Sequence, residues 1–457
     1  MARGIGSRKP KMSFLSDMLA AITERGRALT DFTVIPQAAT PIEQITALCR
    51  GLLSSRGEAS ALATASEILA RYRRLDRPTK LEFFRMLLDE FGPNMEPLVA
   101  AARAFTASPD ERAAEALHRL SEPRRQNLFR MLNQSAQGTA ELIRMRADLL
   151  AMLSDHAELE PVDKDFQHLF RSWFNRGFLE LRRIDWDTPA ATLERIIRYE
   201  AVHEIEDWDD LRRRIDPPDR RLYAFFHPRL RDEPLIFVEV ALAREITTSI
   251  DLILSPERDV IGTDEADTAV FYSISDCQLG LRGISFGNFL IKQVVEELRT
   301  ELPQLTRYVT LSPVPLFARW LSSQPIGDLG VEAVLQPDWW QDPKQASAVE
   351  RRLTALAAWY LTGPRDAAGR LLDPVARFHL GNGARLERIN WLANPGPGGL
   401  ASSYGIMVNY LYKLGEIERN HEAYASGQPV AASGSVRRLA AAGARLLKVA
   451  DTNGGKS

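Results

Sequence analysis

The feature that most constrains the fold of this chain is a change in its apolar pattern near Trp186. Before it, from about residue 40 to 175, apolar residues recur in segment after segment with the 3.6-residue period of a helix. The segment 61–75, for example, places four of them on one stripe: Leu62, Ala65, Leu69 and Tyr72. After it, short runs rich in β-branched and aromatic residues take over. The pattern predicts a helical first region followed by a region built on a sheet.

Short polar or proline-containing connectors separate the periodic segments of the first region. These segments are residues 61–75, 81–91, 96–105, 109–120, 124–131 and 137–155. Helices joined by short connectors pack as antiparallel neighbours, so we predict a helical bundle over residues 1–180. This region carries no chemical motif, and we therefore expect it to mediate self-association.

The second region mixes β-prone runs with helical segments. The runs are residues 220–226, 235–241, 270–275, 307–311, 385–392 and 403–412, and helices are expected at about 288–302 and 346–361. The chain as a whole is therefore predicted to have an α+β fold, with an α/β domain over residues 181–457. Its last twenty residues, rich in Ala and Gly, are expected to be poorly ordered.

Composition excludes several classes of function. A formal net charge of −2 provides no cationic surplus for general nucleic-acid binding. Cys49 and Cys277 are too few for a Cys-based zinc site, and we expect both to be buried thiols in a reducing compartment. The histidines lack HxH and HExxH spacing, so no metal site is predicted. No apolar run approaches the roughly 20 residues of a membrane helix and no targeting signal is clear, so we expect a cytoplasmic protein.

A glycine-containing turn lies between a β-run and an amphipathic helix, at residues 279–288 (LGLRGISFGN). Glycine lets the backbone come close to a ligand, and the free N–H groups at the start of a helix favour a pyrophosphate. The spacing matches neither a Walker loop nor GxGxxG. From the residues alone, a phosphate cradle and an ordinary strand-to-helix turn both remain open.

Three separated blocks carry a resemblance to a known family. They are residues 273–321, which include the turn and the motif TLSPVP, residues 378–391 (FHLGNGARLERINW) and residues 404–410 (YGIMVNY). In this order they resemble the malonyl-CoA decarboxylase family, whose catalytic domain has a GNAT-like fold. The resemblance implies conversion of malonyl-CoA to acetyl-CoA and CO2 by a homotetramer. Because the thioester is itself an electron sink, we expect the reaction to need neither metal nor biotin. Because CoA is part of the substrate, no separate cofactor is implied.

The resemblance also implies site residues. Ser312 is implied to meet the malonyl carboxylate and His379 to supply a proton, and we predict that they form a hydrogen-bonded catalytic dyad. The substrate or its CoA is expected to contact the turn and one tyrosine: Arg282, Gly283, Ile284, Ser285, Phe286, Gly287, Asn288 and Tyr412. Animal members of the family carry a glutamate where this chain has Ser285, so a role for that carboxylate does not carry over.

Other readings of the same residues stay open. A serine before proline is often an ordinary turn residue, and a histidine between Phe378 and Leu380 also fits a packed side chain. At the level of function, the alternatives are a GNAT N-acyltransferase and a non-catalytic regulator that binds malonyl-CoA. Malonyl-CoA supplied alone separates the three, because a transferase needs an acceptor and a regulator leaves the substrate intact.

Overall fold

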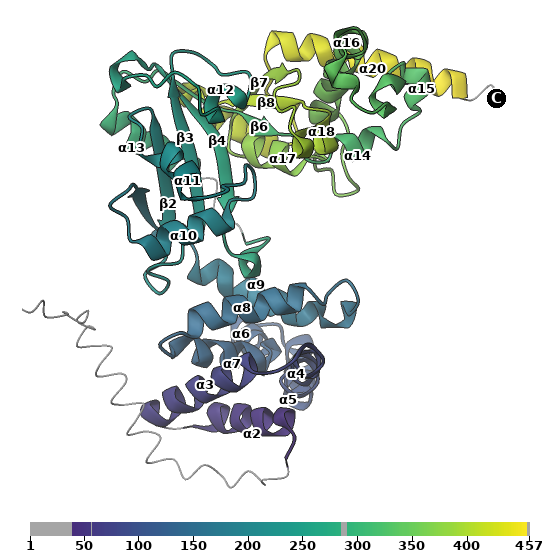
Figure 1. The fold of residues 1–457 in the computed structure, drawn as a ribbon. Coiled ribbons are helices and arrows are strands. Elements are labelled where there is room, and N and C mark those ends of the chain that lie inside the picture. Colours follow the sequence, from purple (N-terminus) through teal and green to yellow (C-terminus); the bar gives the residue numbers. More distant parts are fainter. Residues whose placement is uncertain (1–38, 56, 285–289, 455–457) are drawn as a thin grey trace, which may run out of the picture. The chain divides into compact units, whose positions relative to one another are not determined.

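The computed structural model describes residues 39–55, 57–284 and 290–454. The chain divides into two compact units, and in Figure 1 the main stretch of the first is coloured purple to blue and that of the second teal to yellow. The first, the helical unit, runs to Phe178 and also includes His227–Arg231 and residues 278–284. The second, the sheet unit, holds the rest from Leu179 onward. The predicted α+β fold, with a helical N-terminal region before a mixed sheet, is confirmed.

Eight helices form the described part of the helical unit, apart from single-turn 3-10 segments. They are α2 Pro41–Ser54, α3 Glu58–Arg73, α4 Arg77–Glu90, α5 Met95–Ala107, α6 Glu111–Ser121, α7 Arg124–Gln134, α8 Gly138–Leu150 and α9 Glu160–Trp173. Asp76 and Asp110 cap two of them by accepting a backbone N–H three residues on. The predicted stripe in α3 is largely buried, since Ala65, Leu69 and Tyr72 lie in the core.

One eight-stranded sheet organises the second unit. Its order is β1 Glu180–Ile184, β2 Arg220–Phe226, β3 Ile236–Ala243, β4 Thr268–Asp276, β5 Arg307–Thr310, β8 Met407–Leu411 and β6 Ser312–Pro313, while β7 Arg385–Asn390 pairs with β8. The β4–β5 pair is parallel, and α13 Leu290–Glu301 lies in the crossover that such a pair requires. The other pairs run antiparallel.

Helices surround this sheet. They are α10 Ala190–Tyr199, α11 Trp208–Ile215, α12 Asp251–Leu254, α14 Phe317–Leu321, α15 Ile326–Leu329, α16 Pro343–Thr362, α17 Pro374–Gly381, α18 Pro397–Ser403, α19 Ile417–Ala425 and α20 Gly434–Gly454. In the ranges that the structure describes, none of the helices is long and apolar enough to cross a membrane. Cys49 and Cys277 are both buried and unbonded to each other, as predicted.

The expectation of a poorly ordered C-terminal segment is wrong for residues 438–454, which belong to α20. Alanine and leucine favour the helix, and small residues let α20 pack closely on α16. Gly443 comes so near that a Cβ placed on it would lie 2.3 Å from the Ala355 carbonyl oxygen. Ala and Gly in this segment therefore serve helix packing.

Candidate functional site

The sheet unit brings Ser312 and His379 together across 67 residues of sequence. Ser312 begins the short strand β6, and His379 lies in the last turn of α17. The Ser312 hydroxyl oxygen is 3.2 Å from His379 Nε2, and both side chains are buried. The two residues that were predicted to pair therefore lie within hydrogen-bond distance.

Local sequence explains why α17 begins and ends where it does. Asp373 caps the helix, since its Oδ1 accepts from the Ala376 N–H at 2.9 Å, and Pro374 fits the first helical position. Beyond the helix, Gly383 adopts a φ of 84°, and a Cβ there would lie 2.2 Å from the Ile417 carbonyl oxygen. This glycine is therefore required by both conformation and space.

Two tyrosines hold the His379 ring in place. The Tyr412 hydroxyl lies 2.9 Å from His379 Nδ1. The Tyr410 ring stacks on the imidazole, with ring centroids 4.6 Å apart and an interplanar angle of 23°. Both tyrosines come from β8 or the residue after it, so one strand sets the ring's orientation.

Burial makes this cluster neutral. It lowers the pKa of His379 to about 3, so the imidazole carries a single proton at neutral pH. It also raises the pKa of Tyr412 well above its ordinary value, so the phenol keeps its proton. Ser312, His379 and Tyr412 thus form a row of three neutral groups that can each donate one hydrogen bond.

Ser312 and His379 face a cavity of about 350 Å3. Its other lining residues are mostly apolar: Val202, Ile236, Phe271, Tyr272, Ile274, Asp276, Pro313, Pro374, Val375 and Phe378. An apolar cavity with a few polar groups is typical of a small-ligand site. Tyr412 lies on the far side of the imidazole and lines a second cavity of about 180 Å3, with Lys292, Glu296, Arg299 and Glu418.

The predicted turn is described only in part. Ser285, Phe286, Gly287 and Asn288 lie outside the described residues. Arg282 and Gly283 are exposed and Ile284 is buried, and Gly283 adopts a φ of 77°. Their segment packs within the helical unit, where buried Arg146 donates to the carbonyl oxygens of Gly280 at 2.7 Å and Arg282 at 2.9 Å. Contact between these residues and CoA stays a prediction.

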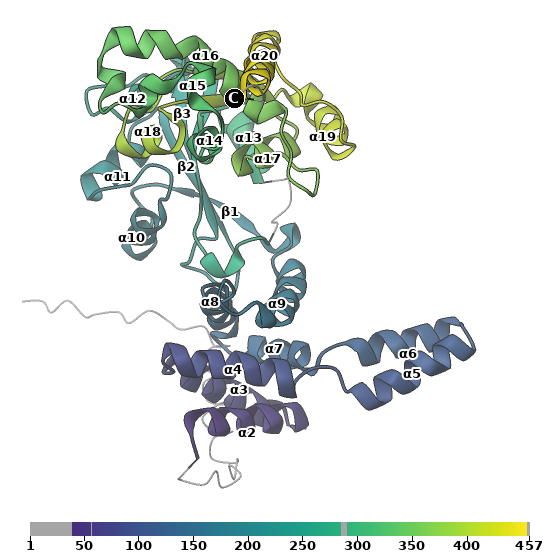
Figure 2. The same ribbon diagram turned by 90° about the vertical axis from the view of Figure 1, so that its right-hand side faces the viewer.

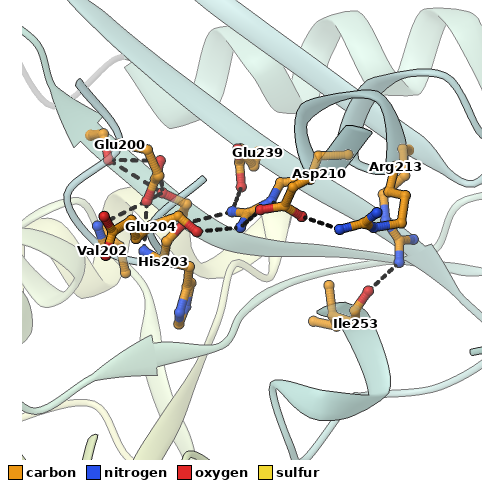
Figure 3. A network of polar contacts seen from close by, with 12 residues as sticks. Glu200, Val202, His203, Glu204, Asp210, Arg213, Glu239 and Ile253 are labelled. Atoms are coloured by element: carbon orange, nitrogen blue, oxygen red, sulfur yellow. Dashed lines mark hydrogen bonds and ion pairs between the residues drawn. The ribbon is translucent and has the colours of Figure 1, made fainter. Parts of the chain in front are cut away.

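A buried polar network, which the sequence reasoning missed, supports one wall of the larger cavity (Figure 3). The Glu200 carboxylate accepts from the hydroxyls of Ser273 and Ser275 on β4 and from the N–H groups of Val202 and His203. It thereby fixes the loop that carries Val202 to the cavity. No spacing in the sequence reveals this role, because Glu200 lies more than 70 residues from the serines that it binds.

Arg214 continues the network from α11. It donates to the carbonyl oxygens of His203 and Glu204, each at 2.7 Å, and pairs with Asp210 and Glu239 (Figure 3). Glu239 on β3 is fully buried, and desolvation, reinforced by the nearby charge of Glu200, raises its pKa to about 8. Within the described ranges, no group of three or more His, Cys, Asp or Glu side chains is placed to hold a metal ion.

Comparison with known proteins places this site in a family. The family model for the malonyl-CoA decarboxylase C-terminal domain matches residues 177–450, and the model for the N-terminal domain matches residues 91–174. The mitochondrial malonyl-CoA decarboxylase of Anser anser anser is 34% identical over a match of 416 residues, and the match covers 81% of this chain and 82% of that one. The mitochondrial enzyme of Rattus norvegicus is 35% identical over a match of 353 residues, and the match covers 70% of this chain and 71% of that one.

Solved structures agree with this placement. The crystal structure of malonyl-CoA decarboxylase from Rhodopseudomonas palustris is 52% identical, with a TM-score of 0.84, and the match covers 88% of this chain and all of that one. The corresponding structure from Agrobacterium vitis is 54% identical, with a TM-score of 0.83, and the match covers 87% of this chain and 99% of that one. The chain therefore belongs to the malonyl-CoA decarboxylase family of carboxy-lyases.

Proposed function

We propose that this chain decarboxylates malonyl-CoA to acetyl-CoA and CO2, with Ser312 and His379 acting on the malonyl group. The observation that carries the proposal is the hydrogen-bonded pair facing an apolar cavity large enough for a small acyl group. Membership of the family supports the substrate. The dyad is our inference from the geometry.

The reaction sets three tasks. When CO2 leaves, its bonding electron pair stays on C2 and spreads onto the thioester oxygen as an enolate. The thioester is thus the electron sink, and we propose that neither metal nor biotin takes part. The protein must hold the carboxylate out of the thioester plane, stabilise the enolate oxygen and deliver a proton to C2.

The site offers a group for each end of the reaction. We assign the Ser312 hydroxyl to the malonyl carboxylate, because it lies at the polar end of the cavity and can turn its one proton from Thr310 to the carboxylate when the substrate binds. Loss of hydration between apolar walls costs the charged carboxylate more free energy than it costs neutral CO2. The cavity therefore favours the release of CO2. We assign His379 as the proton donor, since its Nε2 faces Ser312 and the cavity.

Each turnover consumes one proton, and the arrangement provides a way to replace it. Tyr412 contacts His379 Nδ1 and also lines the second cavity, which holds the titratable side chains of Lys292 and Glu418. We propose that a proton from this side reaches His379 Nδ1 through the phenol when the substrate binds, so that the imidazole still carries one proton after Nε2 has given its own to C2. Tyr412 then acts in proton supply, on the opposite side of the imidazole from the acyl cavity.

The test is incubation with malonyl-CoA alone, followed by mass spectrometry of acetyl-CoA and CO2. We expect turnover by the wild type, and a fall in kcat of about 10²–10⁴ in both Ser312→Ala and His379→Ala. Turnover that requires an added amine would favour an N-acyltransferase, and binding without turnover would favour a regulator. Unchanged kcat in both folded variants would contradict the dyad.

We also propose that the helical unit mediates assembly into a homotetramer. Helices α5 and α6 form a hairpin that extends away from α2 to α4 (Figure 2), and neither contains a buried residue. Met95 and Val99 on α5 are 61% and 42% exposed, which suits a surface covered by a second copy of the chain. Light scattering should give the mass of four chains, and Val99→Asp should lower it. A monomeric wild type would overturn the proposal.

A cytoplasmic location stays a prediction.

A further inference from the structure

Thr310, the last residue of β5, contacts Ser312 but has no role in the reaction proposed above. Its side chain is fully buried. The Thr310 hydroxyl oxygen accepts the Ser312 hydroxyl at 2.8 Å and the Tyr410 backbone N–H at 3.1 Å. In this geometry Ser312 is the donor, so its only hydroxyl proton points toward Thr310 and away from His379.

Thr310 is itself held firmly. Its backbone oxygen accepts from Asn409 Nδ2 at 2.8 Å, and Asn409 Oδ1 accepts from Asn390 Nδ2, also at 2.8 Å. All three residues are buried, and they join strands β5, β8 and β7. The acceptor for the Ser312 proton is therefore part of the sheet's rigid frame.

We infer that Thr310 is a positioning residue that holds the Ser312 proton, so that His379 Nε2 donates to Ser312 rather than accepting from it. The imidazole is neutral and carries one proton. With that proton on Nε2, Nδ1 must accept, and the partner within reach is the Tyr412 hydroxyl. The hydrogen bonds then run in one direction, from Tyr412 to His379 to Ser312 to Thr310.

The direction of these hydrogen bonds is opposite to that in a site where histidine activates a serine nucleophile. In such a pair the imidazole accepts the serine proton, and the oxygen is prepared for attack. Here, before the substrate binds, Thr310 holds that proton away from the imidazole, and the imidazole keeps its own on the nitrogen nearest the cavity. The site is therefore arranged to give a proton, which is what an enolate carbon needs. The catalytic consequence of this inference rests on the proposed decarboxylation. The position of the proton is independent of it.

The kinetic test compares Thr310→Val with Thr310→Ser. Valine keeps the shape of threonine but removes the acceptor, whereas serine keeps the acceptor and loses only a methyl group. We expect Thr310→Val to lower kcat on the order of 10-fold, with KM changed less than about twofold, and Thr310→Ser to restore most of the loss. Equal kcat for the valine variant and the wild type would overturn the inference.

A double-mutant cycle distinguishes positioning from general damage to the fold. If Thr310 acts through Ser312, adding Thr310→Val to Ser312→Ala should cause no further fall in kcat. An equal fall in both backgrounds would mean that the effect comes from the lost Tyr410 N–H partner or from misfolding, and would overturn the inference.

The proton can also be located without any turnover. In wild-type protein labelled with ¹⁵N-histidine, the His379 resonances, assigned with His379→Gln, should show a protonated Nε2 and an unprotonated Nδ1. A protonated Nδ1 would overturn the inference even if every kinetic variant misfolds. If the wild type does not decarboxylate malonyl-CoA, the proposed function fails, while this measurement still decides the direction of the hydrogen bonds.

Discussion

Replacing Glu239 by Gln should change how the stability of the sheet unit depends on pH. The Glu239 carboxyl is fully buried, and burial raises its pKa from 4.5 to about 8. Between these values the folded chain holds a proton that the unfolded chain has lost. The free energy of unfolding contributed by this group therefore falls as pH rises, by about 1.4 kcal/mol per pH unit.

The expected magnitude follows from that slope. Between about pH 5.5 and about pH 7, both inside the window, the wild type should lose roughly 2 kcal/mol relative to Glu239→Gln, which cannot ionise. Urea unfolding followed by tryptophan fluorescence reports mainly on the sheet unit, because of the eight tryptophans only Trp173 precedes Leu179. Glu257→Gln, which alters an exposed carboxylate of the same unit, is the matched control and should follow the wild type.

The sign of the result tests the reasoning. A difference between Glu239→Gln and wild type that does not vary with pH would show that the carboxyl has the same affinity for protons in both states. A wild type that gains stability relative to the variant as pH rises would mean that the ion pair with Arg214 outweighs desolvation. Either outcome would refute the assignment of a protonated, buried Glu239.

Three further predictions concern single contacts. Tyr412→Phe removes the hydroxyl beside the imidazole, so we expect kcat to fall about 10–100-fold in steady-state assays while KM stays nearly constant. An unchanged kcat would exclude proton supply through the phenol. Gly443→Ala forces a methyl group against the Ala355 carbonyl and should lower the free energy of unfolding, measured in urea, by about 1–3 kcal/mol. An unchanged free energy of unfolding would contradict close packing of α20 on α16. Arg146→Ala leaves Asp163 buried without its ion-pair partner, with the Gln167 amide still donating to it. It should destabilise the helical unit by about 3–5 kcal/mol, measured by circular dichroism, and a neutral result would mean that the Asp163 charge finds another cation.

Periodicity predicted most elements of the fold because it depends on neighbours within one element. The helices α3 to α8 and the strands β2 to β5 lie close to the ranges expected from the sequence. The ordered C-terminal helix was missed because its stability comes from α16, about 90 residues away in sequence at the Gly443 contact. Similarly, no local pattern indicated that the segment containing Arg282 packs within the helical unit, because Arg146 holds it from 136 residues away.

At the site, too, the sequence predicted some residues and missed those whose role depends on contacts between distant parts of the chain. Family resemblance identified Ser312 and His379, and the structure brings them within 3.2 Å of each other. Tyr412 was predicted to contact the substrate, which stays a prediction, and the structure also places its hydroxyl 2.9 Å from His379 Nδ1. Thr310 carried no signal, because a threonine on a buried strand is commonplace. Its importance depends on which way one hydroxyl points, and a sequence motif does not encode that direction.

The low pKa of His379 is compatible with a role as proton donor once the substrate's charge is considered. In the free protein the imidazole is neutral because burial in an apolar site penalises a positive charge. In the proposed complex a malonyl carboxylate lies beside Ser312, within a few ångströms of Nε2, and an opposite charge at that range raises the pKa of histidine. Binding therefore promotes uptake of a second proton at Nδ1, on the Tyr412 side. Loss of CO2 then moves the negative charge onto the enolate, and transfer of the Nε2 proton to C2 returns the buried site to neutrality. The same apolar surroundings that keep the resting imidazole neutral thus favour proton transfer once the carboxylate has gone.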